Sequence, residues 1–104
     1  MKVFTEDNFE QEVLKAEKPV LIDLWAPWCG PCKALEPAVK AIAEQYEEKL
    51  IVGKLNVDES PLIASKYSVM SIPTLLFFKD GAVHEQIIGL VSKAKIEKKI
   101  LPHL

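Results

Sequence analysis

The segment "LWAPWCGPCK", Leu24 to Lys33, joins an apolar run to an amphipathic one through a pair of cysteines. The run "PVLIDLWA", which begins at Pro19, is apolar on both faces of a strand apart from Asp23, as in a central strand covered by helices on both sides. The segment from Pro31, between the two cysteines, to Tyr46 has the apolar spacing of a helix, with Leu35, Val39 and Ile42 on one face. The stretch therefore predicts a buried strand that leads directly into a helix.

The rest of the chain alternates in the same way. The spacing of Phe9 and Val13 predicts a helix over Thr5 to Ala16, and Ser92 would cap a last helix with Ile96 and Ile100 facing inward. Between these ends the sequence predicts a strand over 50–57, a short helix over 60–67, and a hairpin of 74–79 and 82–88 around Asp80-Gly81. Strands that alternate with helices and end in a hairpin imply an α/β fold with a mixed sheet.

The length and the charge of the chain favour a single domain and argue against nucleic-acid and membrane partners. The 104 residues suit one domain, residues 1–104, and no window approaches the roughly 18 apolar residues of a membrane span. All 13 basic residues are lysine and the net charge is -2, so we expect no nucleic-acid partner and no membrane association. The N-terminus has acidic residues and no apolar h-region, which leaves the cytoplasm as the expected compartment.

Cys29 and Cys32 are the only two cysteines, and their spacing allows three uses. As a staple, a four-residue ring would contribute only about 2 kcal/mol. As a zinc site, two thiolates would supply half of a tetrahedral set, so a partner chain would have to supply the rest. As a redox pair, Cys29 would lie just before the helix, where the helix dipole favours a thiolate, and Cys32 inside it. The third use predicts that Cys29 is the exposed nucleophile and Cys32 the interior, resolving thiol.

Several motifs in order resemble the thioredoxin family over essentially the whole chain: "LIDLWAPWCGPCK", Pro37, "GKLNVDESP", "SIPTLLFFKDG" and "IGL". The resemblance implies a thioredoxin fold, a central mixed five-stranded sheet flanked by four α-helices. It also implies a thiol-disulfide oxidoreductase that acts as a general protein disulfide reductase, with the Cys29-Cys32 disulfide as its redox group and no bound cofactor or metal. We expect a monomer that acts on disulfide-containing proteins and is recharged by a thioredoxin reductase, usually an NADPH-dependent flavoprotein.

Asp23 is the candidate catalytic carboxyl. Strand alternation places it on the face of Leu21 and Trp25, where burial would raise its pKa. A partly hydrated carboxylate bonded to backbone is the alternative. By the resemblance Asp23 lies beneath Cys32 and relays its proton, with Lys54 as a charge partner, although a strand lysine is often simply solvated.

Four more residues are candidates for substrate binding. By the resemblance the Ile72-Pro73 bond is cis and the backbone of Ile72 pairs with an extended substrate, whereas base rates alone favour a trans bond. Trp28 would belong to the same surface, and Gly89 would form its rim or serve only as a turn glycine.

Gly30 and Pro31 would tune the redox potential through the first turn of the helix. Met70 stands where many relatives carry a basic residue or glycine, which would make the contact surface more apolar.

Other functions use the same residues differently. An oxidase or isomerase would keep the chemistry but run it in the opposite direction, and the Gly-Pro spacer argues against this reading. A non-enzymatic subunit would use the surface only for docking. A zinc site shared with a partner chain is the remaining alternative.

Overall fold

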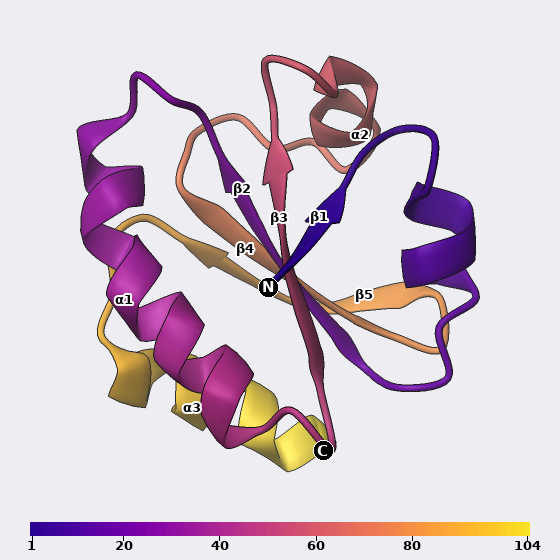
Figure 1. Cartoon of the computed structure of the whole chain (residues 1–104). Helices are drawn as coiled ribbons and strands as arrows, with labels where there is room; N and C mark the ends of the chain where they lie inside the picture. Colours follow the sequence, from indigo (N-terminus) through magenta and orange to yellow (C-terminus); the bar gives the residue numbers. More distant parts are fainter.

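Five strands form one mixed sheet in the order β1-β3-β2-β4-β5 in the computed structural model, which covers residues 1–104 (Figure 1). β3 pairs with β1 and β2 in parallel, whereas β4 pairs antiparallel with β2 and β5. β2 is therefore central. The strands are β1 (Lys2–Phe4), β2 (Val20–Trp25), β3 (Ile51–Asn56), β4 (Thr74–Lys79) and β5 (Ala82–Ile88).

Helices cover both faces of this sheet. α1 and α3 lie on one face, while α2 and the one-turn π-helix η1 lie on the other (Figure 1). With η1 counted, four helices flank a five-stranded mixed sheet, which confirms the predicted fold. The helices are α1 (Gly30–Gln45), α2 (Pro61–Lys66), α3 (Lys93–Ile100), η1 (Glu10–Leu14) and the terminal 3-10 turn η2 (Leu101–His103).

The alternation of β2 divides the core into two clusters. Leu21 faces α1 and α3, where it joins the buried residues Leu35, Val39, Ile42, Ile96 and Ile100. Its neighbours Val20, Ile22 and Leu24 face the opposite side, where they join Phe4, Phe9, Val13, Ile63 and Phe78. Asp23 follows Leu21 by two positions, so it points to the face that α1 covers.

The first helix is shorter than the predicted Thr5 to Ala16. Only Glu10–Leu14 form η1, in which the Lys15 N–H donates to the Glu10 carbonyl at 2.9 Å. Before it, the Asn8 side chain accepts from the Thr5 N–H at 2.8 Å and donates to the Val3 carbonyl at 3.0 Å. These side-chain bonds hold 5–8 in a turn, so the helix begins only after this turn.

The β4-β5 hairpin was predicted from the sequence, whereas strand β1 was not. The hairpin forms as predicted, with positive φ at Asp80 (53°) and Gly81 (78°), as a two-residue loop between strands favours. β1 is the strand that local patterning missed, because three residues carry too little alternation to be read.

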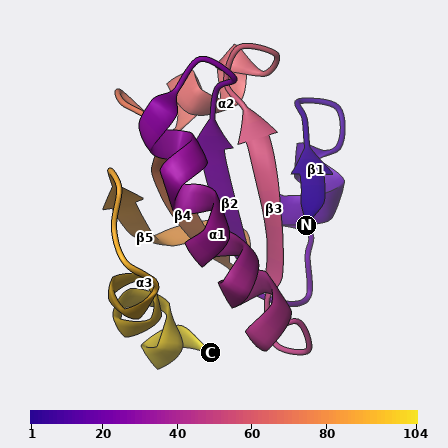
Figure 2. The ribbon, with the colours of Figure 1, turned by 60° about the vertical axis from the view of Figure 1, so that its left-hand side comes forward.

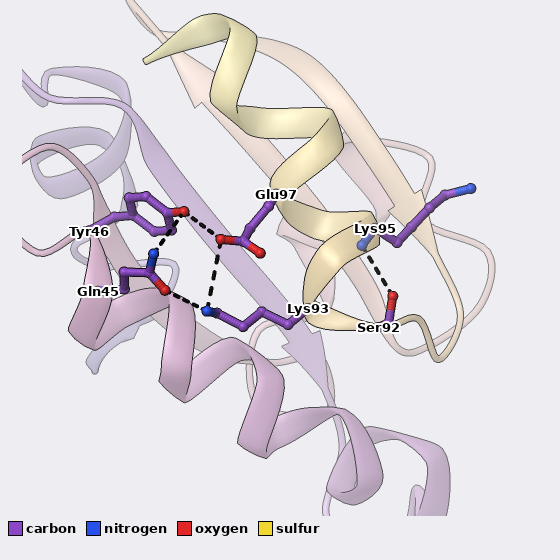
Figure 3. Close-up of polar contacts among 6 residues, drawn as sticks. All are labelled: Gln45, Tyr46, Ser92, Lys93, Lys95 and Glu97. Carbon is purple, nitrogen blue, oxygen red and sulfur yellow. Dashed lines mark hydrogen bonds and ion pairs between the residues drawn. The ribbon is translucent and has the colours of Figure 1, made fainter.

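A polar cluster joins the end of α1 to α3 (Figure 3). Tyr46 donates to Glu97, which is 3.8 Å from Lys93, and Gln45 accepts from Lys93. At the start of α3, the Ser92 hydroxyl accepts from the Lys95 N–H at 3.1 Å, as predicted for a helix cap. The far end of α1 is thereby fixed to the body of the molecule.

The opposite end of α1 is where the cysteines lie. In Figure 2 the arrowheads of β2 and β3 point to the end of the sheet at which α1 begins. The segment that joins β2 to α1 therefore places Cys29 and Cys32 at the carboxyl ends of two parallel strands. Such an edge is where open α/β sheets build their functional sites.

Candidate redox site

Cys29 and Cys32 form a disulfide at the N-terminus of α1. Their Cα atoms are 5.3 Å apart, which suits a disulfide across the first turn of a helix. Cys29 is the N-cap residue, with φ -93° and ψ 107°, and Cys32 lies inside the helix. Gly30 and Pro31 complete the turn, and both are exposed.

The predicted difference in exposure between the two cysteines is wrong for this disulfide form. Cys29 is 4% exposed and Cys32 is 3% exposed. Both sulfurs pack in a small cluster with Ala26, covered by the half-buried Trp25, Val57 and Ile72. Because the disulfide holds the two sulfurs in contact, the side chains that cover Cys32 also cover Cys29.

The two sulfurs differ in a polar contact instead. The backbone N–H of Cys32 donates to Cys29 Sγ at 3.2 Å, whereas Cys32 Sγ accepts no hydrogen bond. In the reduced protein, the same N–H and the positive end of the α1 dipole would stabilise negative charge on Cys29.

Asp23 is buried in the centre of β2 with 1% of its surface exposed, and its Oδ1 atom has no hydrogen-bond partner. Burial, which disfavours the charged form, raises the pKa of Asp23 from 3.8 to about 6, against a lowering by Lys54 and with a smaller rise from Glu36. This confirms the predicted raised pKa, and it contradicts the alternative of a carboxylate satisfied by backbone.

Lys54 lies beside Asp23 in the parallel register of β2 and β3, but no ion pair joins them. Lys54 Nζ instead lies 2.8 Å from Glu36 Oε2 and 4.3 Å from the centre of the Trp25 ring. Glu36 is a member of the site that the sequence prediction missed. Its position one turn after Cys32 on the same helix was the available signal.

The exposed apolar surface beside the cysteines is a shallow groove of about 390 Å³. Trp28 is 70% exposed and donates from Nε1 to Asp58 at 2.9 Å, which fixes the indole at the edge of the groove. The lining residues are Trp28, Val57, Ala64, Val69, Met70, Ser71 and Ile72.

Ile72 closes the groove on the side of the cysteines. The Ile72-Pro73 peptide bond is cis, as the resemblance implied. The N–H and the carbonyl of Ile72 make no hydrogen bond within the chain, although its side chain packs on the cysteine cluster. Gly89 donates its N–H to the Pro73 carbonyl at 2.8 Å with φ 89°, so Gly89 lies next to this segment.

No three histidine, cysteine, aspartate or glutamate side chains gather as a metal site would require. None of the helices is both long and apolar enough to cross a bilayer.

A disulfide that spans the first turn of a helix, with an apolar groove beside it, is typical of a thiol-disulfide oxidoreductase. The comparisons with known proteins agree with this class. The thioredoxin family model matches residues 1–101. Thioredoxin 1 of Nostoc sp. is 48% identical over 100 residues, which cover 96% of this chain and 94% of that protein. A thioredoxin of Chlorobaculum thiosulfatiphilum is 49% identical over 100 residues, 96% of this chain and 93% of its own length.

A chloroplastic M-type thioredoxin of Chlamydomonas reinhardtii is 50% identical over 99 residues, 95% of this chain and 71% of that protein. The chain belongs to the thioredoxin family. It is a disulfide reductase that works by dithiol-disulfide exchange, and its redox group is the Cys29-Cys32 disulfide.

Proposed function

We propose that the chain, acting as one domain over residues 1–104, reduces protein disulfides with Cys29 as the attacking group and Cys32 as the resolving group. The Cys29 thiolate attacks one sulfur of the substrate disulfide, and the other sulfur leaves as a thiolate that takes up a proton. Cys32 then loses its proton and attacks Cys29 Sγ, which expels the second substrate thiol. The substrate gains two electrons and two protons, and the enzyme gains the Cys29-Cys32 disulfide.

The hydrogen bond from the Cys32 N–H to Cys29 Sγ is the observation that carries this assignment of roles. It gives Cys29 a donor for the charge of a thiolate, and Cys32 has none of its own. Because the two cysteines share one helical turn, attack by Cys32 requires little movement of the backbone.

Asp23 is proposed to accept the proton of Cys32 when that thiol attacks. Its burial on the face that α1 covers and its unpartnered oxygen support this role. With a pKa of about 6, Asp23 is ionised at neutral pH and still a stronger base than an ordinary aspartate.

The substrate is proposed to bind as an extended segment along Ile72. Free N–H and carbonyl groups at Ile72 could pair with such a segment as a neighbouring strand would. Trp28 and Met70 offer apolar contact in the adjacent groove, and Gly89, hydrogen-bonded to Pro73, would form its rim. The contact of Lys54 with Trp25 supports a tuning role for this lysine, alongside Gly30 and Pro31 in the first turn of α1.

The recharging step is proposed to use a thioredoxin reductase, since the disulfide formed in each cycle needs an external reductant. We further propose that the protein acts as a monomer in the cytoplasm. The cytoplasm suits this chemistry, because thiols are kept reduced there and the reduced pair is the form that attacks a substrate disulfide.

Trapping the mixed disulfide tests the assignment of the two cysteines. Cys32→Ser should accumulate a covalent complex with a disulfide-containing substrate, because the attacking thiol remains and the resolving thiol is gone. Cys29→Ser is the matched control, and it should form little of this complex. Mass spectrometry of the non-reduced products identifies the linked residue. A complex that forms through Cys32 in the Cys29→Ser protein, and as fast as the Cys32→Ser complex, would contradict the assignment.

A further inference from the structure

Lys54 is held by two groups, neither of which is Asp23. Its Nζ atom lies 2.8 Å from Glu36 Oε2 of α1 and 4.3 Å from the centre of the Trp25 ring. The Lys54 side chain is 21% exposed, and the Glu36 side chain is 48% exposed. The ammonium is thus fixed at the boundary between the sheet and the solvent, where an ion pair and a cation–π contact act together.

The same lysine is placed to reach Asp23. β2 and β3 pair Asp23 with Lys54 in parallel register, so the two side chains leave the same face of the sheet on neighbouring strands. Asp23 Oδ1 nevertheless accepts no hydrogen bond. A buried carboxyl oxygen without a partner is costly, and the nearest ammonium that could satisfy it is bound elsewhere.

The other elements around Asp23 offer no competing cation. β4 places Leu75 opposite it, and α3 presents the apolar Ile96 and Ile100 to this face. From α1, Glu36 is the charged residue that acts on Asp23, and the sulfurs of the disulfide carry no titratable proton. Lys33 and Lys40 share a surface hollow with Glu36, but neither lies within ion-pair distance of it. The ion pair of Glu36 is therefore made with Lys54.

We propose that Glu36 is a positioning residue, which holds the Lys54 ammonium away from Asp23 and so keeps this buried carboxyl able to bind a proton near neutral pH. An ammonium in direct contact would favour the ionised carboxylate, because the Asp23 carboxyl is buried where water screens its charge poorly. Glu36 also acts on Asp23 through its own negative charge, in the same direction. The inference deepens the proposed function, since it rests on Asp23 as the proton acceptor for Cys32.

The titration of Asp23 tests this inference directly in the oxidised protein, where the cysteines do not titrate. The carboxyl carbon of Asp23 is followed by NMR against pH in the wild type and in Glu36→Gln. We expect the midpoint to fall by about one pH unit in Glu36→Gln, as Lys54 turns toward Asp23. Glu44→Gln is the matched control, with the same charge change two turns along α1 at a residue without an ion pair, and it should leave the midpoint in place. An unchanged midpoint in Glu36→Gln would overturn the proposal.

A Lys54→Met background separates positioning from the direct charge of Glu36. Without the ammonium, Glu36→Gln can change the midpoint only through the lost negative charge. We expect this second shift to be clearly smaller than the shift measured with Lys54 present. Equal shifts in the two backgrounds would show that Glu36 acts by its charge alone, and positioning would be refuted.

The pH profile of mixed-disulfide resolution keeps this inference separate from the role of Asp23. If both hold, the acid limb of the profile moves to lower pH in Glu36→Gln by the same amount as the titration midpoint. A loss of rate that is equal at every pH would indicate structural damage and count against the proposal. A titration that shifts while the profile stays in place would support the positioning by Glu36 and refute Asp23 as the proton acceptor.

Discussion

At the level of single residues, Cys29 and Cys32 differ in their polar contacts and hardly at all in their exposure. Both are buried in the disulfide form, and only Cys29 Sγ accepts a hydrogen bond, from the Cys32 N–H. The different roles of two chemically identical side chains therefore depend on their places in one helical turn. The N-cap position provides donors for a thiolate, and the interior position does not.

Asp23 links stability to pH. Its pKa is raised from 3.8 in an ordinary aspartate to about 6 by burial, so the folded state binds its proton more tightly than the unfolded state. The resulting stability is fully present below the ordinary pKa and is lost as pH rises through the raised one. Asp23→Asn removes the cost of a buried charge, and should stabilise the protein at pH 7 by up to about 3 kcal/mol.

Urea unfolding at a series of pH values measures this effect. The advantage of Asp23→Asn over the wild type should disappear below about pH 3, where Asp23 is protonated in both states. Asp7→Asn is the control, because Asp7 is exposed and makes no hydrogen bond or ion pair. Asp23→Asn should also reduce a protein disulfide more slowly than the wild type does. An Asp23→Asn protein that is both less stable at pH 7 and fully active would contradict the account.

Residue chemistry explains which parts of the site could be predicted from the sequence. The burial and raised pKa of Asp23 follow from strand alternation, and the exposure of Trp28 from its place outside the strand. The cis bond before Pro73 came only from resemblance, since nothing in the local sequence requires it. Glu36 was missed because its role depends on Lys54, which is distant along the chain and meets Glu36 only when α1 packs on the sheet.

At the level of elements, most helices and strands were predictable, including the short helix α2, whereas β1 was missed and η1 is shorter than predicted. β2, α1, β3 and the β4-β5 hairpin follow from apolar runs and turn residues, because their patterns extend over several residues. β1 and η1 are short, and their structure depends on contacts outside the local sequence. The Asn8 side chain holds the turn before η1, and pairing with β3 defines β1.

The Ser92 hydroxyl caps the N-terminus of α3. Ser92→Ala removes the hydroxyl that accepts from the Lys95 N–H, and should lower the free energy of unfolding by about 1 kcal/mol. Thermal or urea denaturation of both proteins checks this value. Ser65→Ala is the control, because Ser65 is exposed within α2 and its side chain makes no hydrogen bond, so its replacement should not destabilise. Equal losses in the two variants would show that the Ser92 hydroxyl does not act as a cap.

At the level of the whole molecule, the sheet with its two cores forms a support for a site at one end. Helices on both faces bury the strands of the sheet. The cysteine turn directly follows β2, which is the central strand. The disulfide closes only a four-residue ring, so it contributes little to holding this body together. The pair can therefore open and close as a redox couple while the two core clusters hold the fold.

The redox potential of the Cys29-Cys32 couple indicates whether the protein reduces or oxidises its partners. We expect a midpoint near the value of thioredoxins, about -270 mV, which is taken from the family and not from this structure. Equilibration with glutathione buffers, followed by quantification of the oxidised fraction, measures it. A midpoint near the value of about -120 mV for strong oxidants would instead identify an enzyme that forms disulfides in its partners.

The rates at which the two cysteines of the reduced protein are alkylated test the central claim most directly. The reduced chain is treated with a limiting amount of iodoacetamide near pH 7, and peptide mass spectrometry quantifies the label at each position over time. We predict that Cys29 is labelled several-fold faster than Cys32, because the Cys32 N–H and the N-terminus of α1 stabilise its thiolate. Equal rates, or a faster rate at Cys32, would contradict the division of roles between the two sulfurs.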